Sequence, residues 1–118
     1  MKLLIIEDDL VISNYLCNGL LENYHNVDLA TDGIEGLELC FTSEYDVIIV
    51  VRMLPNIDGI SIIKTLRENK IFTPISIISN LGYVNDKIES LTAGANEFLS
   101  KPFEFGGFYL FLIDKNNI

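Results

Sequence analysis

The sequence alternates between short apolar runs and longer segments with helical spacing, and this alternation restricts its fold more than any other feature. We interpret five runs as strands: residues 3–6, 27–30, 47–51, 75–78 and 97–99. The first, third and fourth are almost continuously apolar and rich in Ile and Val, which is typical of strands buried on both faces. Strands that alternate with helices form parallel sheets with helical crossovers. The sequence therefore predicts an open α/β fold with helices on both faces of the sheet.

Four segments between these runs carry apolar residues at helical spacing, and each set of apolar residues is expected to form the buried face of a helix. The first three sets are Val11, Ile12, Tyr15, Leu16 and Leu20; Ile34, Leu37, Cys40 and Phe41; and Ile60, Ile63 and Leu66. The third helix is expected to begin at Asp58-Gly59. The fourth is expected to span residues 86–93, with Asn85 as its N-cap and Gly94 at its end.

The composition is that of an ordinary globular domain. A chain of 118 residues can bury a hydrophobic core without disulfides or structural metal ions, and 49% of its residues are apolar. The net charge of −9 argues against direct contact with nucleic acid, because phosphate contacts need a basic surface. The apolar N-terminal run is too short for a signal peptide or a membrane span. We expect a cytoplasmic domain without membrane contact, with Cys17 and Cys40 as reduced thiols.

The region 104–118 is atypical for the fifth helix that should follow the last strand. It opens with Gly106-Gly107, and each glycine costs about 1 kcal/mol relative to alanine inside a helix. Residues 108–113 are then apolar on every face, whereas a surface helix has a polar side. The segment is therefore either a short helix, a helix buried in a partner, or not a helix.

Polar residues stand at the carboxyl ends of three predicted strands, where sites form in open parallel sheets. These groups are Glu7-Asp8-Asp9, Ser79-Asn80 and Ser100-Lys101-Pro102. Paired carboxylates suit Mg²⁺, whereas a hydroxyl and an ammonium group suit a phosphoryl group. The acids alone could instead cap a helix N-terminus. The three groups together favour a site at this edge.

Five motifs in the chain resemble the receiver domain of two-component response regulators, closest to the OmpR/PhoB subfamily. They are "LLIIEDD", "ATDGIEG", "DVIIVVRMLPNIDG", "TPISIIS" and "GANEFLSKPF". The resemblance covers residues 1 to about 105. It implies a (βα)5 flavodoxin-like receiver fold with a five-stranded parallel sheet in the order 2-1-3-4-5. Residues 1–118 are then expected to form one receiver domain, without an output domain.

The resemblance also implies a metal and phosphate site. Glu7 and Asp8 match the acidic pair that holds Mg²⁺, and Met53 matches the residue whose backbone carbonyl is a further ligand. Ser79 matches the switch hydroxyl that senses phosphate, and Lys101 matches the lysine that pairs with phosphate.

Two further matches concern conformation. Phe98 matches the aromatic switch residue, whose ring moves inward when the hydroxyl engages phosphate. The bond between Lys101 and Pro102 is expected to be cis, as it is in the family.

Val51 departs from the family pattern, because it stands where the family carries the phosphoacceptor aspartate. Valine has no side-chain oxygen, so it forms no acyl phosphate and ligates no Mg²⁺. We therefore expect no catalytic residue, no required cofactor, weak Mg²⁺ binding, and a fold more stable than that of the Val51→Asp variant. By strand alternation, Arg52 should point away from Val51.

The dimer interface of the subfamily is also incomplete. Lys87 and Glu97 match two partners of its ion pairs, but Gly107 and Phe111 replace the Glu and Arg of the fifth helix. A homodimer is expected either through the fourth helix, fifth strand and fifth helix, or through the apolar run 108–113. Equally, that run could pack on its own sheet.

The leading interpretation is an atypical receiver domain from a transcriptional regulator, which is expected to signal through protein–protein contacts and not to be an enzyme. Its partner would be a sensor histidine kinase or another regulatory protein, and DNA binding would belong to an output domain. One alternative is an inactivated variant of an ordinary receiver whose native residue at position 51 is aspartate; such receivers catalyse their own phosphorylation. A remote alternative is a flavodoxin-like cofactor binder, but acids after the first strand would repel phosphate.

Overall fold

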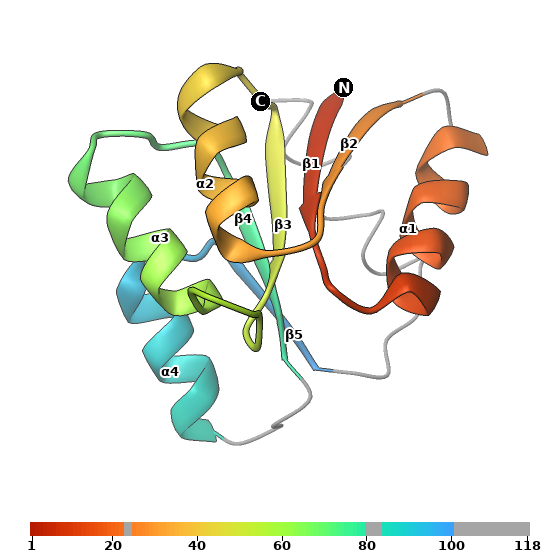
Figure 1. The fold of residues 1–118 in the computed structure, drawn as a ribbon. Helices are drawn as coiled ribbons and strands as arrows, with labels where there is room; N and C mark the ends of the chain where they lie inside the picture. The colour runs from red at the N-terminus through yellow and green to blue at the C-terminus, as the bar shows by residue number, and fades with distance from the viewer. Residues whose placement is uncertain (23–24, 80–83, 101–118) are drawn as a thin grey trace.

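The computed structural model describes residues 1–22, 25–79 and 84–100, and in this part of the chain five strands alternate with four helices (Figure 1). The strands are β1 Lys2–Ile6, β2 Asn26–Ala30, β3 Val47–Val51, β4 Ile75–Ser79 and β5 Glu97–Ser100. The helices are α1 Leu10–Glu22, α2 Gly33–Thr42, α3 Gly59–Glu68 and α4 Val84–Ala93. The predicted fifth helix, with Gly107 and Phe111, lies outside the described residues, as do Lys101 and Pro102.

All strand pairs are parallel, and the order in the sheet is β2-β1-β3-β4-β5, which confirms the predicted topology. Helix α1 lies on one face of the sheet, and α2, α3 and α4 lie on the other (Figure 1). Ile6 pairs with Val50, and Val51 pairs with Ile78. The carboxyl ends of β1, β3 and β4 therefore reach the same edge of the sheet.

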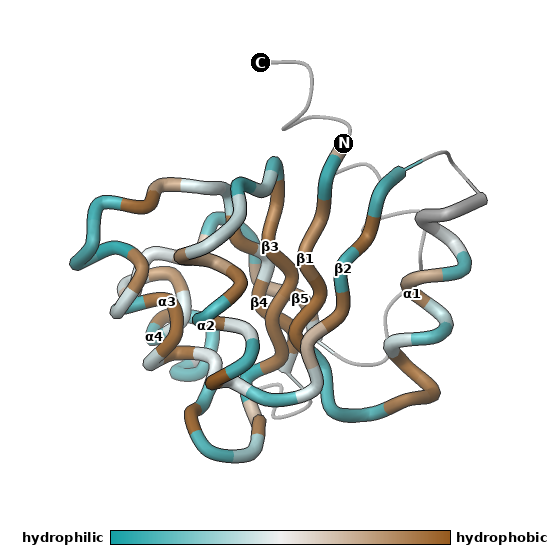
Figure 2. The backbone as a smooth tube through the Cα atoms, turned by 45° about the horizontal axis from the view of Figure 1, so that its top comes forward, coloured by the Kyte–Doolittle hydropathy of each residue, from teal (hydrophilic) through white to brown (hydrophobic). Residues whose placement is uncertain are grey.

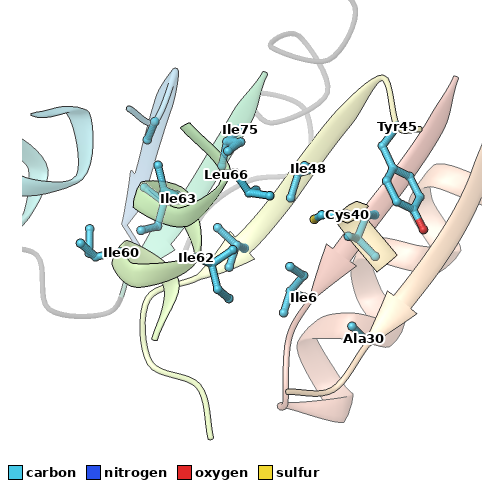
Figure 3. Packing of buried hydrophobic residues seen from close by; sticks show 14 residues of the cluster. Ile6, Ala30, Cys40, Tyr45, Ile48, Ile60, Ile62, Ile63, Leu66 and Ile75 are labelled. Atoms are coloured by element: carbon cyan, nitrogen blue, oxygen red, sulfur yellow. The ribbon is translucent and has the colours of Figure 1, made fainter. Parts of the chain in front are cut away.

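The sheet separates two hydrophobic cores. The α3-side core contains Ile60, Ile63 and Leu66 of α3 together with Ile48 and Ile75 of the sheet (Figure 3). These three residues are buried, as the sequence pattern predicts. The α1-side core contains Leu16 of α1 packed against alternate residues of the central strands. Both faces of β1, β3 and β4 are buried, which explains why these strands are almost uniformly apolar (Figure 2).

The predicted buried face of α1 is only partly correct. Leu16 is buried and Ile12 half-buried, but Val11 is 79% exposed and Tyr15 is also exposed. The side chain of Leu20 lies outside what the structure describes, so its burial stays a prediction. Ser13 is buried instead, and its hydroxyl donates to the carbonyl of Leu10 at 3.2 Å. Because this bond satisfies the hydroxyl within the helix, the small serine can face the sheet.

The predicted face of α2 is also rotated. Cys40 is buried and Leu37 half-buried, but Ile34 and Phe41 are exposed. A Cβ atom added to Gly36 would lie 2.5 Å from Cδ1 of Ile6. The helix therefore packs against β1 through its glycine face, which lets the backbone come closer than larger apolar residues would allow.

The helix ends agree partly with the sequence signals. Asp58 caps α3, accepting from the backbone N–H of Ser61 at 2.8 Å, as predicted. Gly94 follows α4 with φ +121°, where a glycine is favoured. The predicted cap at Asn85 is wrong, because α4 begins at Val84 and Asn85 lies in its first turn. None of the described helices is both long and apolar enough to cross a membrane.

Candidate functional site

The acids after β1 have three different environments. Glu7 is buried, and its backbone N–H donates to the carbonyl of Ala30 at 3.0 Å. Asp8 is exposed. Asp9 caps α1, since its Oδ1 accepts from the backbone N–H of Val11 at 2.9 Å. The capping alternative is thus correct for Asp9, while Glu7 and Asp8 remain candidates for a site.

Val51 closes β3 with a side chain that is 3% exposed. It belongs to the α1-side core, together with Leu16, Ile49 and Ile78. Its environment is therefore apolar on the side toward α1, although Glu7 follows the neighbouring strand at the same edge. Valine brings no donor or acceptor to this position.

The β3–α3 connection lies close to the end of β3. The backbone N–H of Gly59 donates to the carbonyl of Arg52 at 2.9 Å, and a Cβ atom on Gly59 would collide with the carbonyl oxygen of Val51. Met53 lies in this connection and is 63% exposed. Glycine at position 59 thus allows α3 to begin directly against the strand end.

The residues at this edge offer few metal ligands. No group of three or more His, Cys, Asp or Glu side chains suited to hold a metal occurs in residues 1–22, 25–79 and 84–100. Glu7 and Asp8 supply two carboxylates, and Val51 adds none. Mg²⁺ prefers a nearly octahedral set of oxygen ligands, so this donor set fits the ion only loosely.

Ser79 is buried at the end of β4, and its hydroxyl donates to Oδ2 of Asp86 on α4. Asp86 is also buried, and its Oδ1 accepts from Nη1 of Arg52 at 2.5 Å. Nη2 of Arg52 reaches Oε1 of Glu89 at 3.1 Å. The candidate switch hydroxyl thus belongs to a charged cluster, the Arg52 cluster, formed by Arg52, Ser79, Asp86 and Glu89.

The Arg52 cluster and Val51 lie on opposite faces of the sheet. Arg52 and Ser79 both contact α4, whereas Val51 packs on the α1 side. The prediction that Arg52 points away from Val51 is therefore confirmed. Burial alone would lower the pKa of Arg52, but the hydrogen bond to Glu89 and the charges of Asp86 and Glu89 raise it overall. The guanidinium group accordingly stays charged.

Asp86 and Glu89 were not predicted as partners of Arg52, although the sequence carries a signal for them. The two acids are three residues apart in a helix and therefore share one face. Strand alternation places the Arg52 side chain on the face that this helix covers. A basic residue one position beyond the strand end and two acids at this spacing make the contact a candidate, but only the packing of this helix on the sheet selects these acids as the partners.

The remaining predicted site residues are not members of the Arg52 cluster, or they lie outside the described residues. Phe98 of β5 is half-buried against the α3-side core. Lys87 is exposed on α4, and Glu97 is half-buried at the start of β5. Lys101, Pro102, Gly107 and Phe111 lie outside the described residues, so the predicted cis bond and half of the predicted interface stay predictions.

Comparison with known proteins identifies a family and its relatives. The family model for the response regulator receiver domain matches residues 3–109. The transcriptional regulatory protein CusR of Escherichia coli K12 is 41% identical over 105 residues, which cover 89% of this chain and 46% of CusR. The probable transcriptional regulatory protein SilR of Salmonella typhimurium is 40% identical with the same coverage. The chain thus spans about half the length of the curated relatives it matches.

Solved structures agree in fold. The receiver domain of the Francisella response regulator 1452 has a TM-score of 0.94 and 37% identity, and the match covers 97% of this chain and 94% of that one. The receiver domain of the sensor histidine kinase PA1611 from Pseudomonas aeruginosa has a TM-score of 0.89 and 28% identity, with coverages of 99% and 97%. That structure has a magnesium ion coordinated in its active site cleft.

Proposed function

The chain belongs to the family of response regulator receiver domains, and we propose that it signals as an atypical receiver that is not phosphorylated at position 51. The carrying observation is the buried Val51 at the carboxyl end of β3. By its resemblance to the family, the motif "DVIIVVRMLPNIDG" implies that the phosphoacceptor aspartate would stand at this position. An acyl phosphate forms only on a carboxylate, and valine has none. The domain then works as a signalling module through protein contacts, not as an enzyme.

The same substitution affects metal binding. Among the candidates, only Glu7 and Asp8 bring carboxylates, with the backbone carbonyl of Met53 as a further oxygen. With one carboxylate fewer than in the family, the electrostatic attraction for a divalent cation is weaker. Weak Mg²⁺ binding is therefore part of the proposal, and no cofactor is required.

The partner would be a sensor histidine kinase or another regulatory protein, since receivers of this family act in such pairs. Self-association is proposed through the face that contains α4 and β5, with Lys87 and Glu97 at its charged positions, or through the apolar run 108–113. Ile88 and Leu91 are exposed on α4 and give this face an apolar component.

The proposed setting is the cytoplasm, and the proposed pathway regulates transcription. The names of the relatives indicate transcriptional regulation for those proteins. Contact with DNA is assigned to an output domain and not to these residues, because the net charge of −9 opposes binding to phosphates.

Incubation with acetyl phosphate and Mg²⁺, followed by intact-protein mass spectrometry, tests the proposal. The chain should gain no phosphoryl mass, whereas the Val51→Asp variant should gain one phosphoryl group. The Val51→Asn variant is a matched control, because asparagine has a similar shape without a carboxylate. A phosphoryl adduct on the unaltered chain, at any residue, would overturn the proposal.

One alternative has support from the same edge of the sheet. Glu7, Asp8 and Ser79 lie at the same edge of the sheet as position 51, with the Ser79 side chain on the opposite face from Val51. This set of residues fits an inactivated form of an ordinary phospho-accepting receiver in which valine replaces the aspartate. If this is correct, the Val51→Asp variant should be phosphorylated as efficiently as a typical receiver, and phosphorylation should change its interactions. Phosphorylation without any change in association or in partner binding would favour the atypical receiver.

A further inference from the structure

We infer that Arg52 fixes helix α4 against the end of β3, so that α4 and the Ser79 hydroxyl keep one arrangement without any phosphoryl group. The inference rests on the proposed function, because it assigns to Arg52 the control of α4 that phosphorylation at position 51 would otherwise provide. Four observations carry it: the anchoring of Arg52, its contacts with α4, the burial of Asp86, and the position of Ser79.

The backbone of Arg52 is held on two sides. Its N–H donates to the carbonyl of Ile78 on β4 at 2.8 Å, and its carbonyl accepts from the N–H of Gly59 at 2.9 Å. The side chain therefore starts from a fixed point between β4 and the beginning of α3. Because the backbone is already ordered at this point, only the side chain has to be ordered when the guanidinium group binds.

The guanidinium group contacts two carboxylates on one face of α4. Nη1 reaches Asp86 at 2.5 Å and Nη2 reaches Glu89 at 3.1 Å. These acids are three residues apart and would repel each other without a cation between them. Because the planar guanidinium group donates in two directions at once, it joins the first and second turns of α4 to the strand end.

The burial of the pair makes the contact with Asp86 the dominant one. The side chains of Arg52 and Asp86 are 18% and 4% exposed, whereas that of Glu89 is 52% exposed. A buried carboxylate that loses its cation keeps an uncompensated charge, so separation of this pair is strongly unfavourable. The exposed pair with Glu89 is screened by solvent and contributes less.

The hydroxyl of Ser79 is oriented by the same carboxylate. It donates to Oδ2 of Asp86 while Arg52 donates to Oδ1. Rotation of this hydroxyl toward the opposite face, where Val51 packs, would break a bond to a charged acceptor, and Val51 offers no replacement. Arg52 therefore holds α4, and through Asp86 it holds Ser79.

The consequence concerns the outer surface of α4. Lys87, Ile88 and Leu91 are exposed on this helix and move with it. If Arg52 holds α4 in one place, the domain presents this surface constantly. A partner that recognises α4 then finds its binding surface without a phosphorylation event.

Amide hydrogen exchange followed by NMR tests the inference, with the Arg52→Gln variant compared with the Lys64→Gln variant. Lys64 is exposed on α3, so its replacement removes the same charge outside the cluster. Arg52→Gln should increase exchange of the amides in α4 at least tenfold more than exchange in α1 and α3. Lys64→Gln should leave these rates within about twofold of the unaltered chain.

Two further variants keep the test decisive if Arg52→Gln folds poorly. Glu89→Gln removes only the exposed partner and should increase α4 exchange two- to fivefold. Ser79→Ala removes the hydroxyl but leaves the Arg52–Asp86 pair, and α4 exchange should change less than threefold.

An equal increase in all helices for Arg52→Gln, or a Ser79→Ala effect as large as that of Arg52→Gln, would overturn the inference. If Arg52→Gln does not fold, an increase in α4 exchange below twofold for Glu89→Gln would overturn it. These rates are measured without a phosphodonor. Failure of the inference is therefore distinguishable from failure of the proposed function, which appears as a phosphoryl adduct in the mass spectrum.

Discussion

Replacement of Val51 by aspartate should destabilise the domain in metal-free buffer. Val51 is 3% exposed, so the change removes a buried side chain that contributes roughly 1.5–3 kcal/mol. The register of Ile6 with Val50 places Glu7 beside position 51, about one strand spacing of ~4.8 Å away. Repulsion between the two carboxylates adds on the order of 1–3 kcal/mol, reduced if one of them is protonated.

The expected total is about 2.5–6 kcal/mol, which corresponds to a fall in melting temperature of roughly 10–25 °C for a domain of this size. Thermal unfolding should be followed by circular dichroism in buffer with a chelator, and then with Mg²⁺. Val51→Thr is the matched control, because threonine has a similar shape and no charge. The expected order of stability is Val51, then threonine, then aspartate, and Mg²⁺ should raise the melting temperature of the aspartate variant most.

A melting temperature of the Val51→Asp variant equal to or higher than that of the unaltered chain, in metal-free buffer, would contradict this prediction. That result would mean that water reaches the end of β3 and solvates a carboxylate there in addition to those of Glu7 and Asp8. If Val51→Thr loses as much stability as Val51→Asp, the loss of apolar burial would be the whole effect and repulsion would contribute nothing.

Three further predictions concern stability away from the site. Arg67→Met should cost about 3 kcal/mol in urea unfolding, because the guanidinium group donates to three backbone carbonyls and one side-chain amide; a loss below about 1 kcal/mol would contradict this. Ser76→Ala should be neutral or stabilising by up to about 1 kcal/mol, because the buried Ser76 hydroxyl has no hydrogen-bond partner within the described residues. Burial raises the pKa of Cys40 from 9.0 to about 12, and burial with a hydrogen bond to Asp28 raises that of Tyr45 from 10.0 to about 12. The folded state then binds more protons, so stability should stay level below pH 9 and fall between pH 9 and 12; the decline should be smaller in the Cys40→Ala/Tyr45→Phe double variant.

The strands were predictable from local patterns and the sheet order from the family resemblance, whereas helix orientation was predicted less well. Runs such as residues 47–51 are apolar at every position because both faces of β3 are buried, and this signal is local. On α2, by contrast, Ile34 and Phe41 are exposed while Gly36 is buried. A glycine carries no hydrophobic signal, so its close approach to Ile6 becomes visible only when helix and strand are packed.

The candidate site shows the same division. The sequence alone determined that acids follow the first strand, that a hydroxyl follows the fourth, and that valine occupies the strand end between them. Only the tertiary structure decided which groups meet. Ser79 and Arg52 both contact Asp86, which lies seven residues after Ser79 and 34 residues after Arg52 in the sequence. The physical reason is that the residue type determines which interactions a side chain can make. The partner of that side chain depends on which helix covers the face of the sheet to which the side chain points. Here α4 brings a buried carboxylate to that place, and the charged pair it forms is the feature that residue types alone did not reveal.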